Sequence, residues 1–395
     1  MDPVRNPFAP GAGSPPPELT GREDILAKAT VTLARIRDGR PSKSFLMIGL
    51  RGVGKTVLLN RISEIAEDSG FKVFMIEAHE NKSLPELLVP PLRQLLFALD
   101  RYENVNEHVK RALRVLKSFA RGIKVKVGEF DIGLDIDPER GAADSGDLES
   151  DLPELLLAVA RAASARGTAA GVIIDEMQYL NEIELSALIM AIHRVAQKQL
   201  PLVLVGAGLP QLVGLTGRSK SYAERLFDFP AVDALDPNAA RKALQQPVQR
   251  EDVHFTSDAL DEIVRITEGY PYFLQEWGYH TWNLARTSPI ELATVRAAYA
   301  TVIQRLDESF FRVRFDRLTP RERDYLRAMA ELGPGAHRSG DIAEMLHAGV
   351  RAVAPLRNTL IRKGMIYSPQ HGDTAFTVPL FDQFMKRIMP EMRSR

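Results

Sequence analysis

One segment of the chain has the residue types and the spacing of a phosphate-binding loop. Residues 49–56 read Gly-Leu-Arg-Gly-Val-Gly-Lys-Thr and fit the pattern G-x-x-x-x-G-K-[ST]. The apolar run Ser44–Ile48 before them predicts a buried strand, and Thr56–Ile62 predicts the start of a helix. Successive backbone N–H groups at a helix N-terminus bind anions. The sequence therefore predicts a nucleoside triphosphate site; the alternative is a glycine-rich surface turn.

The side chains of this loop have different predicted roles. Lys55 is expected to reach the terminal phosphates, and the hydroxyl of Thr56 is expected to ligate Mg²⁺. ATP and Mg²⁺ are therefore the predicted cofactors. The other residues expected at the nucleotide are Gly49, Gly52, Gly54 and Val57.

A pair of carboxylates follows a second apolar run. The segment Gly171–Ile174 ends in Asp175 and Glu176. An aspartate after a buried strand holds the Mg²⁺ shell beside a phosphate loop. Glu176 is expected to orient and deprotonate a water molecule for in-line attack on the γ-phosphate. The alternative is a strand that ends in solvated carboxylates, which the phosphate loop upstream disfavours.

Length and composition limit the class of protein. A chain of 395 residues predicts two or three domains, and 51 basic residues balance 51 acidic ones. The chain has no cysteine, which excludes disulfides and cysteine-bound zinc, and its 8 histidines show no metal-ligand spacing. No signal-like segment and no run of about 18 apolar residues occurs. We therefore expect a cytoplasmic protein with no membrane association.

Strand and helix patterns alternate over the first half of the chain. Strands are predicted at 44–48, 72–78, 170–175, 202–205 and, more weakly, 226–232. This alternation indicates an α/β fold, a parallel sheet covered by helices on both faces. The segments predicted to lie outside this pattern are an extended arm at 7–17, a β-hairpin at 123–137 and an acidic mobile loop at 139–151.

Helix starts and a change of pattern divide the chain further. Capping boxes are predicted at Thr20–Glu23 and Ser288–Glu291, and a helix start with proline at the first helical position is predicted at Thr319–Glu322. From 235 to 317 the pattern is helical throughout. We therefore expect an N-terminal arm (1–18), an ATPase core (19–233), a helical domain (234–317) and a third unit (318–395).

The third unit resembles a winged helix-turn-helix. Its predicted elements are helices at 320–331, 340–346 and 351–363, a hairpin at 365–378 and a final helix. In the third helix Val353, Leu356 and Leu360 share one face, and the opposite face is polar and free of acids. Such a face suits contacts with DNA phosphates and base edges. The residues predicted to contact duplex DNA are Arg351, Arg357, Asn358, Arg362 and Lys363. The alternative is a protein-docking module.

Three motifs together resemble the AAA+ ATPases. They are Leu19–Glu23, the phosphate loop and Ile173–Gln178. Within that group the chain is most similar to the initiator and origin-recognition type and to the related archaeal-type and STAND ATPases. The resemblance implies a P-loop parallel sheet of the additional-strand, catalytic-glutamate class, with 72–78 as the extra strand between the phosphate-loop strand and the aspartate strand. It also implies that 234–317 is a helical lid and that a winged helix follows.

The resemblance assigns roles to further residues. Gly21 and Arg22 would flank the adenine, and Pro271 would pack near the base and ribose, as in the Gly-x-Pro motif of the STAND lid. Arg225 stands where such families place an arginine that contacts the γ-phosphate, in its own subunit or in a neighbour's site. The alternative for Arg225 is an ordinary surface arginine before a strand.

Two features depart from the AAA+ pattern. The fourth strand leads through Val205–Leu209 without a polar side chain where sensor 1 usually stands, and Gln178 and Gln211 are the candidates to replace it. The lid has no evident sensor 2 arginine. Both absences favour slow hydrolysis.

The leading interpretation is an Mg²⁺-dependent ATPase that couples its nucleotide state to duplex DNA binding through the winged helix. The alternative is a slow nucleotide-dependent switch whose winged helix binds a protein partner in a signalling or defence assembly. The missing sensor residues favour the switch, and the acid-free helix favours DNA. Both interpretations are compatible with a homo-oligomer. A metabolic kinase is disfavoured because no acceptor-substrate domain is recognisable.

Overall fold

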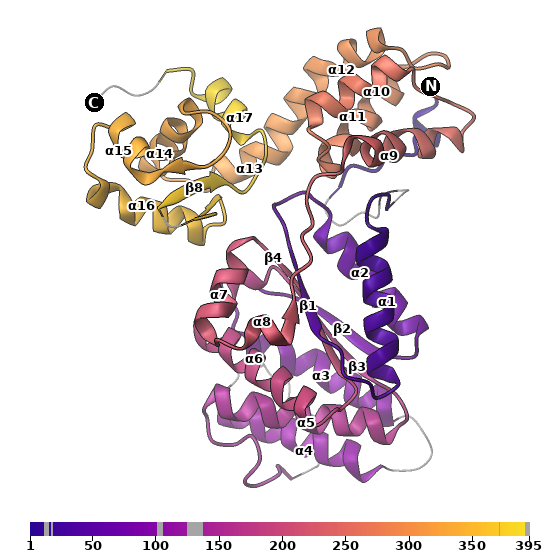
Figure 1. Ribbon diagram of the computed structural model, residues 1–395, viewed down its shortest axis with the longest axis vertical. Coiled ribbons are helices and arrows are strands. Elements are labelled where there is room, and N and C mark those ends of the chain that lie inside the picture. Colours follow the sequence, from indigo (N-terminus) through magenta and orange to yellow (C-terminus); the bar gives the residue numbers. More distant parts are fainter. Residues whose placement is uncertain (12–15, 17–18, 101–105, 125–136, 371, 392–395) are drawn as a thin grey trace. The chain divides into compact units, whose positions relative to one another are not determined.

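The structure is a computed structural model that describes residues 1–11, 16, 19–100, 106–124, 137–370 and 372–391 (Figure 1). The chain divides into two compact units, which we describe separately. The core unit comprises Asp24–Gly49 and Lys55–Ala231, and the helical unit comprises Met1–Glu23, Leu50–Gly54 and Val232–Arg395. Most of the predicted hairpin at 123–137 lies outside the described residues.

The core unit contains a five-stranded parallel sheet. Its strands are β1 (Ser44–Ile48), β2 (Lys72–Glu77), β3 (Ala170–Asp175), β4 (Leu202–Gly208) and β5 (Phe227–Asp228). They lie in the order β2-β3-β4-β1-β5, and each neighbouring pair is parallel. The predicted parallel sheet is therefore confirmed, although β5 is shorter than the predicted strand at 226–232.

The strand between the phosphate-loop strand and the aspartate strand is not the predicted one. β4 lies between β1 and β3, and its residue Val205 is paired with Phe45 on one side and Ile173 on the other. β2, which corresponds to the predicted extra strand at 72–78, lies at the edge of the sheet. The prediction was wrong because crossover connections, rather than sequence order, decide which parallel strands are neighbours.

Helices cover both faces of this sheet, as Figure 1 shows. α2 contacts β2, β3 and β4, while α3 to α6 supply most of the buried apolar residues of the main core. β3 and β4 are buried along their whole length, as expected for central parallel strands. The helices of this part are α1 (Glu23–Arg37), α2 (Lys55–Asp68), α3 (Leu84–Asp100), α4 (Glu107–Gly122), α5 (Leu148–Ala165), η2 (Met177–Tyr179), α6 (Glu182–Gln197), α7 (Gln211–Ser219) and α8 (Ala223–Leu226).

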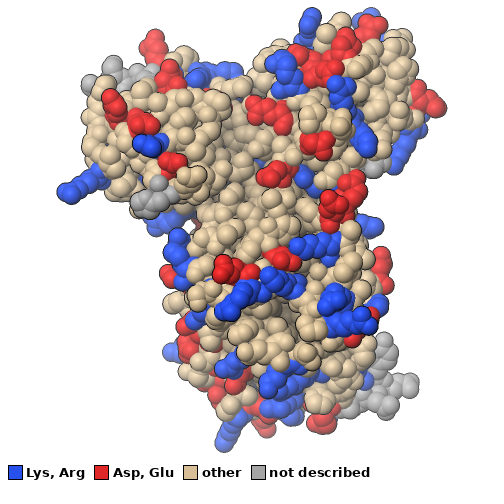
Figure 2. All heavy atoms as spheres, viewed as in Figure 1, with Lys and Arg blue, Asp and Glu red and all other residues tan. Residues whose placement is uncertain are grey.

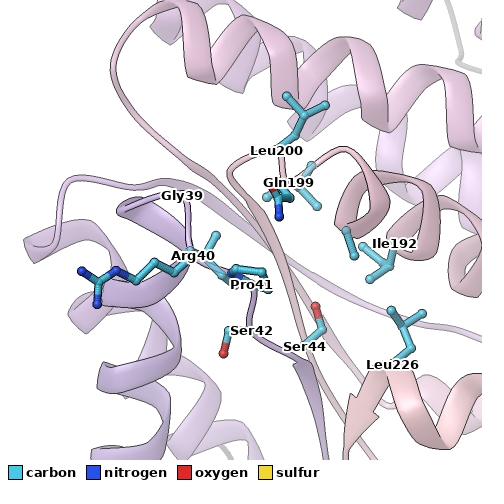
Figure 3. A pocket seen from close by; sticks show the side chains of 12 residues that line it. Gly39, Arg40, Pro41, Ser42, Ser44, Ile192, Gln199, Leu200 and Leu226 are labelled. Atoms are coloured by element: carbon cyan, nitrogen blue, oxygen red, sulfur yellow. The ribbon is translucent and has the colours of Figure 1, made fainter.

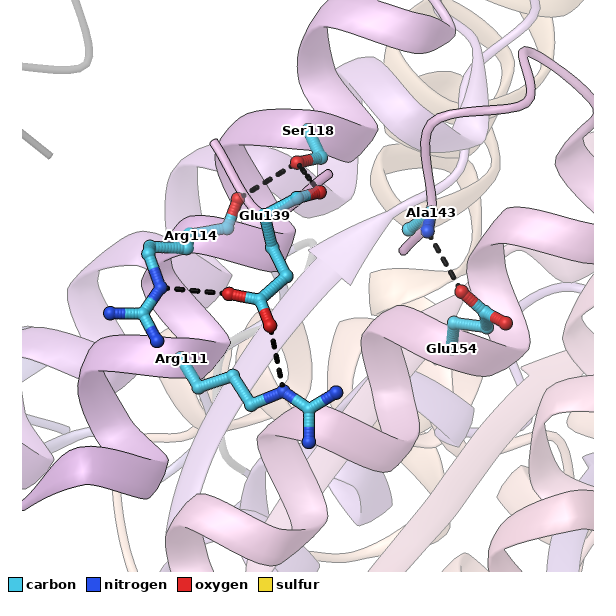
Figure 4. A network of polar contacts seen from close by, with 6 residues as sticks. All are labelled: Arg111, Arg114, Ser118, Glu139, Ala143 and Glu154. Atoms are coloured by element: carbon cyan, nitrogen blue, oxygen red, sulfur yellow. Dashed lines mark hydrogen bonds and ion pairs between the residues drawn. The ribbon is translucent and has the colours of Figure 1, made fainter. Parts of the chain in front are cut away.

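The acidic segment before α5 is held by hydrogen bonds and ion pairs, contrary to the prediction of a mobile loop. Glu139 accepts from Nε of Arg111 at 3.2 Å and from Nε of Arg114 at 2.8 Å (Figure 4). The hydroxyl of Ser118 donates to the backbone oxygen of Glu139 at 2.8 Å. The acids of this segment therefore pair with arginines and backbone N–H groups instead of repelling one another in solvent, and no local sequence pattern specifies those partners.

The helical unit begins with the N-terminal arm and continues with a group of helices. In the arm, η1 (Pro3–Arg5) is a short 3₁₀ turn, and Phe8 is buried with its ring against Gly278. The indole of Trp282 donates to the backbone oxygen of Asp2 at 2.9 Å. The helices are α9 (Pro237–Gln249), α10 (Ser257–Thr267), α11 (Pro271–Leu284), α12 (Leu292–Arg305), the π-helix η3 (Leu306–Phe311) and α13 (Arg312–Phe315).

The C-terminal part of the helical unit, which we call the C-terminal domain, surrounds a small antiparallel sheet. Its elements are α14 (Pro320–Glu331), β6 (His337–Arg338), α15 (Ser339–Met345), α16 (Val350–Arg362), β7 (Ile366–Tyr367), β8 (Asp373–Phe376) and α17 (Phe381–Ile388). The strands lie in the order β6-β8-β7. The predicted helices and hairpin are confirmed, and β6 is an additional strand.

The predicted helix start at Thr319–Glu322 is confirmed, and it forms a capping box. Thr319 caps α14, its hydroxyl accepts from the N–H of Glu322, and the Glu322 carboxylate accepts from the N–H of Thr319. The two capping boxes predicted at Thr20–Glu23 and Ser288–Glu291 were wrong. α1 begins only at Glu23, and the Thr20 hydroxyl donates to Gln246. α12 begins at Leu292, with Glu291 as its N-cap.

Candidate active site

The phosphate loop joins β1 to α2. Gly52 and Gly54 have φ angles of +84° and +93°, a left-handed conformation that favours glycine. Lys55 is the first residue of α2, and its side chain is buried, with Nζ donating to the backbone oxygen of Gly49 at 2.9 Å. Gly49 in turn donates its N–H to the backbone oxygen of Gly208 at 3.1 Å. Lys55 is therefore held by Gly49, which is itself attached to the end of β4. Val57 follows in the first turn of α2.

The predicted Mg²⁺ ligands lie together in the core unit. The Thr56 hydroxyl donates to Oδ2 of Asp175 at 2.5 Å, and the other carboxylate oxygen accepts from the N–H of Glu176 at 2.8 Å. Burial raises the pKa of Asp175, the negative charge of Glu176 adds to the increase, and the Thr56 hydrogen bond opposes it. A hydroxyl and a carboxylate are the hard oxygen donors that Mg²⁺ prefers in phosphate sites. These residues therefore fit the predicted cation.

Glu176 has an unusual backbone conformation at the end of β3. Its φ and ψ angles are 52° and 38°, in the left-handed region that non-glycine residues rarely adopt. Such strained residues cluster at functional sites. The amide group of Gln178 donates to the Glu176 carboxylate, and the Gln178 oxygen accepts from the N–H of Leu209 at 3.1 Å. The carboxylate is thus held beside the ends of β3 and β4.

Arg22 contacts the phosphate loop rather than lying open beside it. Its guanidinium is buried in the helical unit and donates to the backbone oxygens of Val53, at 3.2 Å, and Asp233. Burial lowers the pKa of Arg22, while the nearby charges of Asp233 and Glu23 oppose that shift. A Cβ atom on Gly21 would lie 2.9 Å from the Cβ atom of Ala239, so Gly21 permits a close approach to α9. No sequence signal indicated that Arg22 binds the loop's own carbonyl group.

Pro271 is the first residue of α11, directly after Gly269 and Tyr270. Gly269 has a φ of +72°, and its backbone oxygen accepts from the N–H of Leu235 at 2.9 Å. The N–H of Tyr272 donates to the backbone oxygen of Gly52 at 3.3 Å. Within the helical unit, the first turn of α11 therefore contacts the phosphate loop. The sequence motif indicated Pro271 but did not indicate Tyr272.

Comparison with known families agrees with this geometry. Residues 18–205 match the AAA ATPase domain family, and residues 308–385 match a domain family of unknown function, DUF8462. Residues 18–205 form an AAA ATPase domain of the P-loop type. No match was found among the curated proteins.

Several solved structures are similar to the chain. The Walker-type ATPase Paby2304 of Pyrococcus abyssi has 18% identity and a TM-score of 0.54, with 93% of this chain and 96% of that chain covered. The Orc1 protein of Aeropyrum pernix, in complex with DNA, has 16% identity and a TM-score of 0.48 over 98% and 96%. The RuvB Holliday junction branch migration motor of Thermotoga maritima has 14% identity and a TM-score of 0.44 over 90% and 92%. The first similarity supports the P-loop α/β fold and nothing more specific.

Two other polar residues lie at different edges of the sheet, since Gln211 follows the carboxyl end of β4 whereas Arg225 precedes the start of β5. Arg225 lies on α8, with an exposed side chain. Gln211 begins α7, and its side-chain oxygen is buried without a hydrogen-bond partner among the described residues. Of the two glutamines considered as replacements for sensor 1, Gln178 is the one bonded to both Glu176 and the end of β4.

A pocket lies at the opposite edge of the sheet of the AAA domain, where the strands begin (Figure 3). It is lined by Ser44 at the start of β1, Leu202 at the start of β4, and residues of the loops after α1 and α6, including Pro41 and Leu200. Its volume of about 60 Å³ is enough for a few water molecules. The pocket is therefore too small for a nucleotide and is distant from the phosphate loop.

The residues predicted to bind DNA separate into two groups. Arg351, Asn358 and Arg362 are exposed on α16, on the face opposite the buried Val353 and Leu360. On the face of the molecule shown in Figure 2, acidic and basic side chains are interspersed. The three exposed residues remain available for a partner.

Arg357 and Lys363 instead bind groups of the C-terminal domain itself. Arg357 donates to the Thr374 hydroxyl at 2.9 Å, the Ser368 hydroxyl at 2.8 Å and the backbone oxygen of Asp373 at 3.0 Å. Lys363 donates to the buried Glu322 carboxylate at 2.8 Å. These contacts attach α16 to the hairpin and to α14, so the two side chains differ from the freely exposed DNA contacts that the sequence predicted.

None of the described helices is long and apolar enough to cross a membrane.

Proposed function

We propose that the chain is an Mg²⁺-dependent ATPase whose nucleotide state is coupled to binding of duplex DNA by the C-terminal domain. The AAA domain supports ATP binding. The observation that carries the proposal of hydrolysis is the convergence of Thr56 on Asp175, with Glu176 next to them at the end of β3. We also propose the division into arm (1–18), core (19–233), lid (234–317) and winged-helix domain (318–395).

In the proposed reaction, Lys55 neutralises charge on the terminal phosphates, and backbone N–H groups of the loop bind their oxygens. A bound Mg²⁺ ion, held through Thr56 and Asp175, would supply further charge neutralisation. Glu176 accepts a proton from a water molecule whose oxygen attacks the γ-phosphorus, and the bond to the bridging oxygen of ADP breaks. Arg22 keeps the loop in shape through the Val53 carbonyl group.

Proposed roles for the remaining predicted residues follow from the resemblance to AAA+ ATPases. Gly21 and Pro271 would lie at the base and ribose. The exposed Arg225 side chain would contact a γ-phosphate, either in its own subunit or in a neighbouring copy. ATPase activity per molecule that rises with protein concentration, and no longer does so in Arg225→Ala, would support action on a neighbour.

The proposal that the C-terminal domain is a winged helix rests on its order of elements, which is helix, strand, two helices, two strands and a final helix. The exposed Arg351, Asn358 and Arg362 on its third helix support a major-groove contact. The decisive experiment is fluorescence anisotropy on labelled duplex DNA with ATP, ADP or no nucleotide, over a salt series. DNA binding is excluded if no duplex binds at about 50 mM salt in any state, a condition under which electrostatic binding is strong.

The second candidate function is a slow nucleotide switch with a protein partner. It is favoured by the use of Arg357 and Lys363 inside the domain, which leaves fewer basic groups for phosphates than the sequence predicts. This candidate would be supported if the protein binds ATP, hydrolyses it slowly and does not bind duplex DNA in the same anisotropy series.

A further inference from the structure

We propose that Gln178 is a positioning residue that orients the Glu176 carboxylate and connects it to the end of β4. This inference rests on the proposed ATPase function, because it assigns Gln178 a role only through Glu176. It also identifies what replaces the polar sensor side chain that β4 lacks.

The orientation of the Gln178 amide follows from its two partners. The Leu209 N–H can only donate, so the group that it meets at 3.1 Å is the amide oxygen of Gln178. The amide nitrogen of Gln178 then faces the Glu176 carboxylate and donates to it. Both polar atoms of the amide group therefore have a hydrogen-bond partner, one in the Glu176 carboxylate that follows β3 and one in the backbone that follows β4. A shorter or apolar side chain cannot make both contacts.

The backbone on either side of Gln178 is held by a hydrogen bond and by packing. Gln178 lies in η2, where the N–H of Tyr179 donates to the backbone oxygen of Glu176 at 3.0 Å. Met177 is fully buried, and a Cβ atom on Gly206 would overlap its sulfur atom. The left-handed turn at Glu176 brings its carboxylate to the same side as Gln178. The hydrogen bond thus joins two side chains whose backbones have little freedom.

The end of β4 is shaped to receive the amide. A Cβ atom on Gly208 would lie 3.1 Å from the Gln178 oxygen and 2.8 Å from Leu212, so a side chain there would compete for this space. The backbone oxygen of Gly208 accepts from Gly49, whose own oxygen accepts from Lys55. Gln178 therefore connects the predicted base to the same strand end that supports the phosphate loop.

The experiment compares Gln178→Ala with Gln197→Ala, a control with the same chemical change on the exposed end of α6. We expect Gln178→Ala to lower kcat about 10- to 100-fold, the value of one hydrogen bond to a charged group. ATP affinity and KM should stay within about twofold, because the substitution leaves the side chains of the phosphate loop untouched. Gln178→Asn should behave like Gln178→Ala, because the asparagine side chain is one methylene too short to make both contacts. The asparagine variant is used in place of the alanine variant if the latter does not fold.

A double mutant tests whether Gln178 acts through Glu176. In single-turnover assays with radiolabelled ATP, adding Gln178→Ala to Glu176→Gln should cost no further activity. The proposal is overturned if Gln178→Ala keeps the wild-type kcat, or if it loses ATP affinity to the same extent as kcat. It is also overturned if Gln178→Ala lowers the residual activity of Glu176→Gln by the same factor by which it lowers the kcat of the wild type. Failure of the ATPase proposal is recognised separately, because the wild-type protein itself would then show no ATP turnover.

Discussion

The phosphate loop of the AAA domain and helix α16 of the C-terminal domain both carry residues that the sequence marks for binding, but they differ in how those residues are used. Around the loop, Lys55 and Thr56 at the start of α2 converge with Asp175 at the end of β3. On α16 the basic residues diverge, because Arg357 and Lys363 turn inward while Arg351 and Arg362 stay exposed. A motif on a short loop therefore predicts the contacts of its side chains better than a charge pattern on a helix does.

The difference predicts that single substitutions at the loop abolish function. Lys55→Ala should eliminate measurable ATP binding, because it removes the cation at the phosphate site. Isothermal titration measures the affinity, and Lys72→Ala, an exposed lysine at the start of β2, is the control. Undiminished affinity in Lys55→Ala would show that the loop does not bind the triphosphate.

Glu176→Gln should separate binding from turnover at the same site. We expect ATP and Mg²⁺ to bind normally while hydrolysis falls about 10²- to 10⁴-fold, the usual contribution of a general base. Steady-state phosphate release and titration with ATP measure the two properties. If turnover stays within about threefold of wild type, far below that range, Glu176 is not the base, and the switch becomes the better description.

On α16 the expected effects are smaller and depend on which arginine is changed. Arg351→Ala combined with Arg362→Ala should weaken duplex binding and reduce the slope of log affinity against log salt by about 0.9 for each phosphate that is no longer neutralised. Asn358→Ala should relax sequence preference with little change in slope, as expected for a base-edge contact. Anisotropy over a salt series distinguishes these results.

Arg357→Ala is the matched contrast to the double variant, since it changes the same residue type on the same helix. It should lower the thermal unfolding temperature of the C-terminal domain, because it removes three hydrogen bonds to the hairpin. Equal stability of Arg357→Ala and Arg351→Ala would contradict the division of α16 into inward and outward groups.

The smallest expected effect concerns the pairing of Lys363 with Glu322. Burial disfavours the charged carboxylate, but hydrogen bonds from Lys363 and Thr319 outweigh it and hold the pKa of Glu322 below its ordinary value. The stabilisation is therefore present above the unfolded pKa and is lost as the pH falls through the lower folded pKa. Lys363→Met should cost about 1–3 kcal/mol at neutral pH, as expected when a buried charge is left without its partner.

Urea unfolding of Lys363→Met and wild type at pH 7 and at lower pH tests this pairing. The difference in free energy of unfolding should shrink as Glu322 becomes protonated. Arg351→Met is the control for removal of an exposed cation. A difference that does not change with pH would mean that Lys363 stabilises the domain by packing alone.

The sequence by itself determined the position of the phosphate loop and the positions of the helices in the C-terminal domain. Strand–loop–helix spacing around residues 44–62 predicts the phosphate site, and the apolar periodicity of the C-terminal domain predicts its helices, because local spacing and capping are short-range properties. The helix start at Thr319 was confirmed for that reason, whereas the capping boxes predicted at Thr20 and Ser288 were wrong because the helices begin later, at Glu23 and Leu292.

The tertiary structure alone decided which groups meet across long sequence separations. It inserts β4 between β1 and β3, joins Gln178 to the N–H of Leu209, and directs Arg22 to the carbonyl group of Val53. It also holds the acidic segment at Glu139 with two arginines of α4. These contacts depend on crossover connections and on burial of polar groups that must find a partner, and neither leaves a periodic signal in the chain.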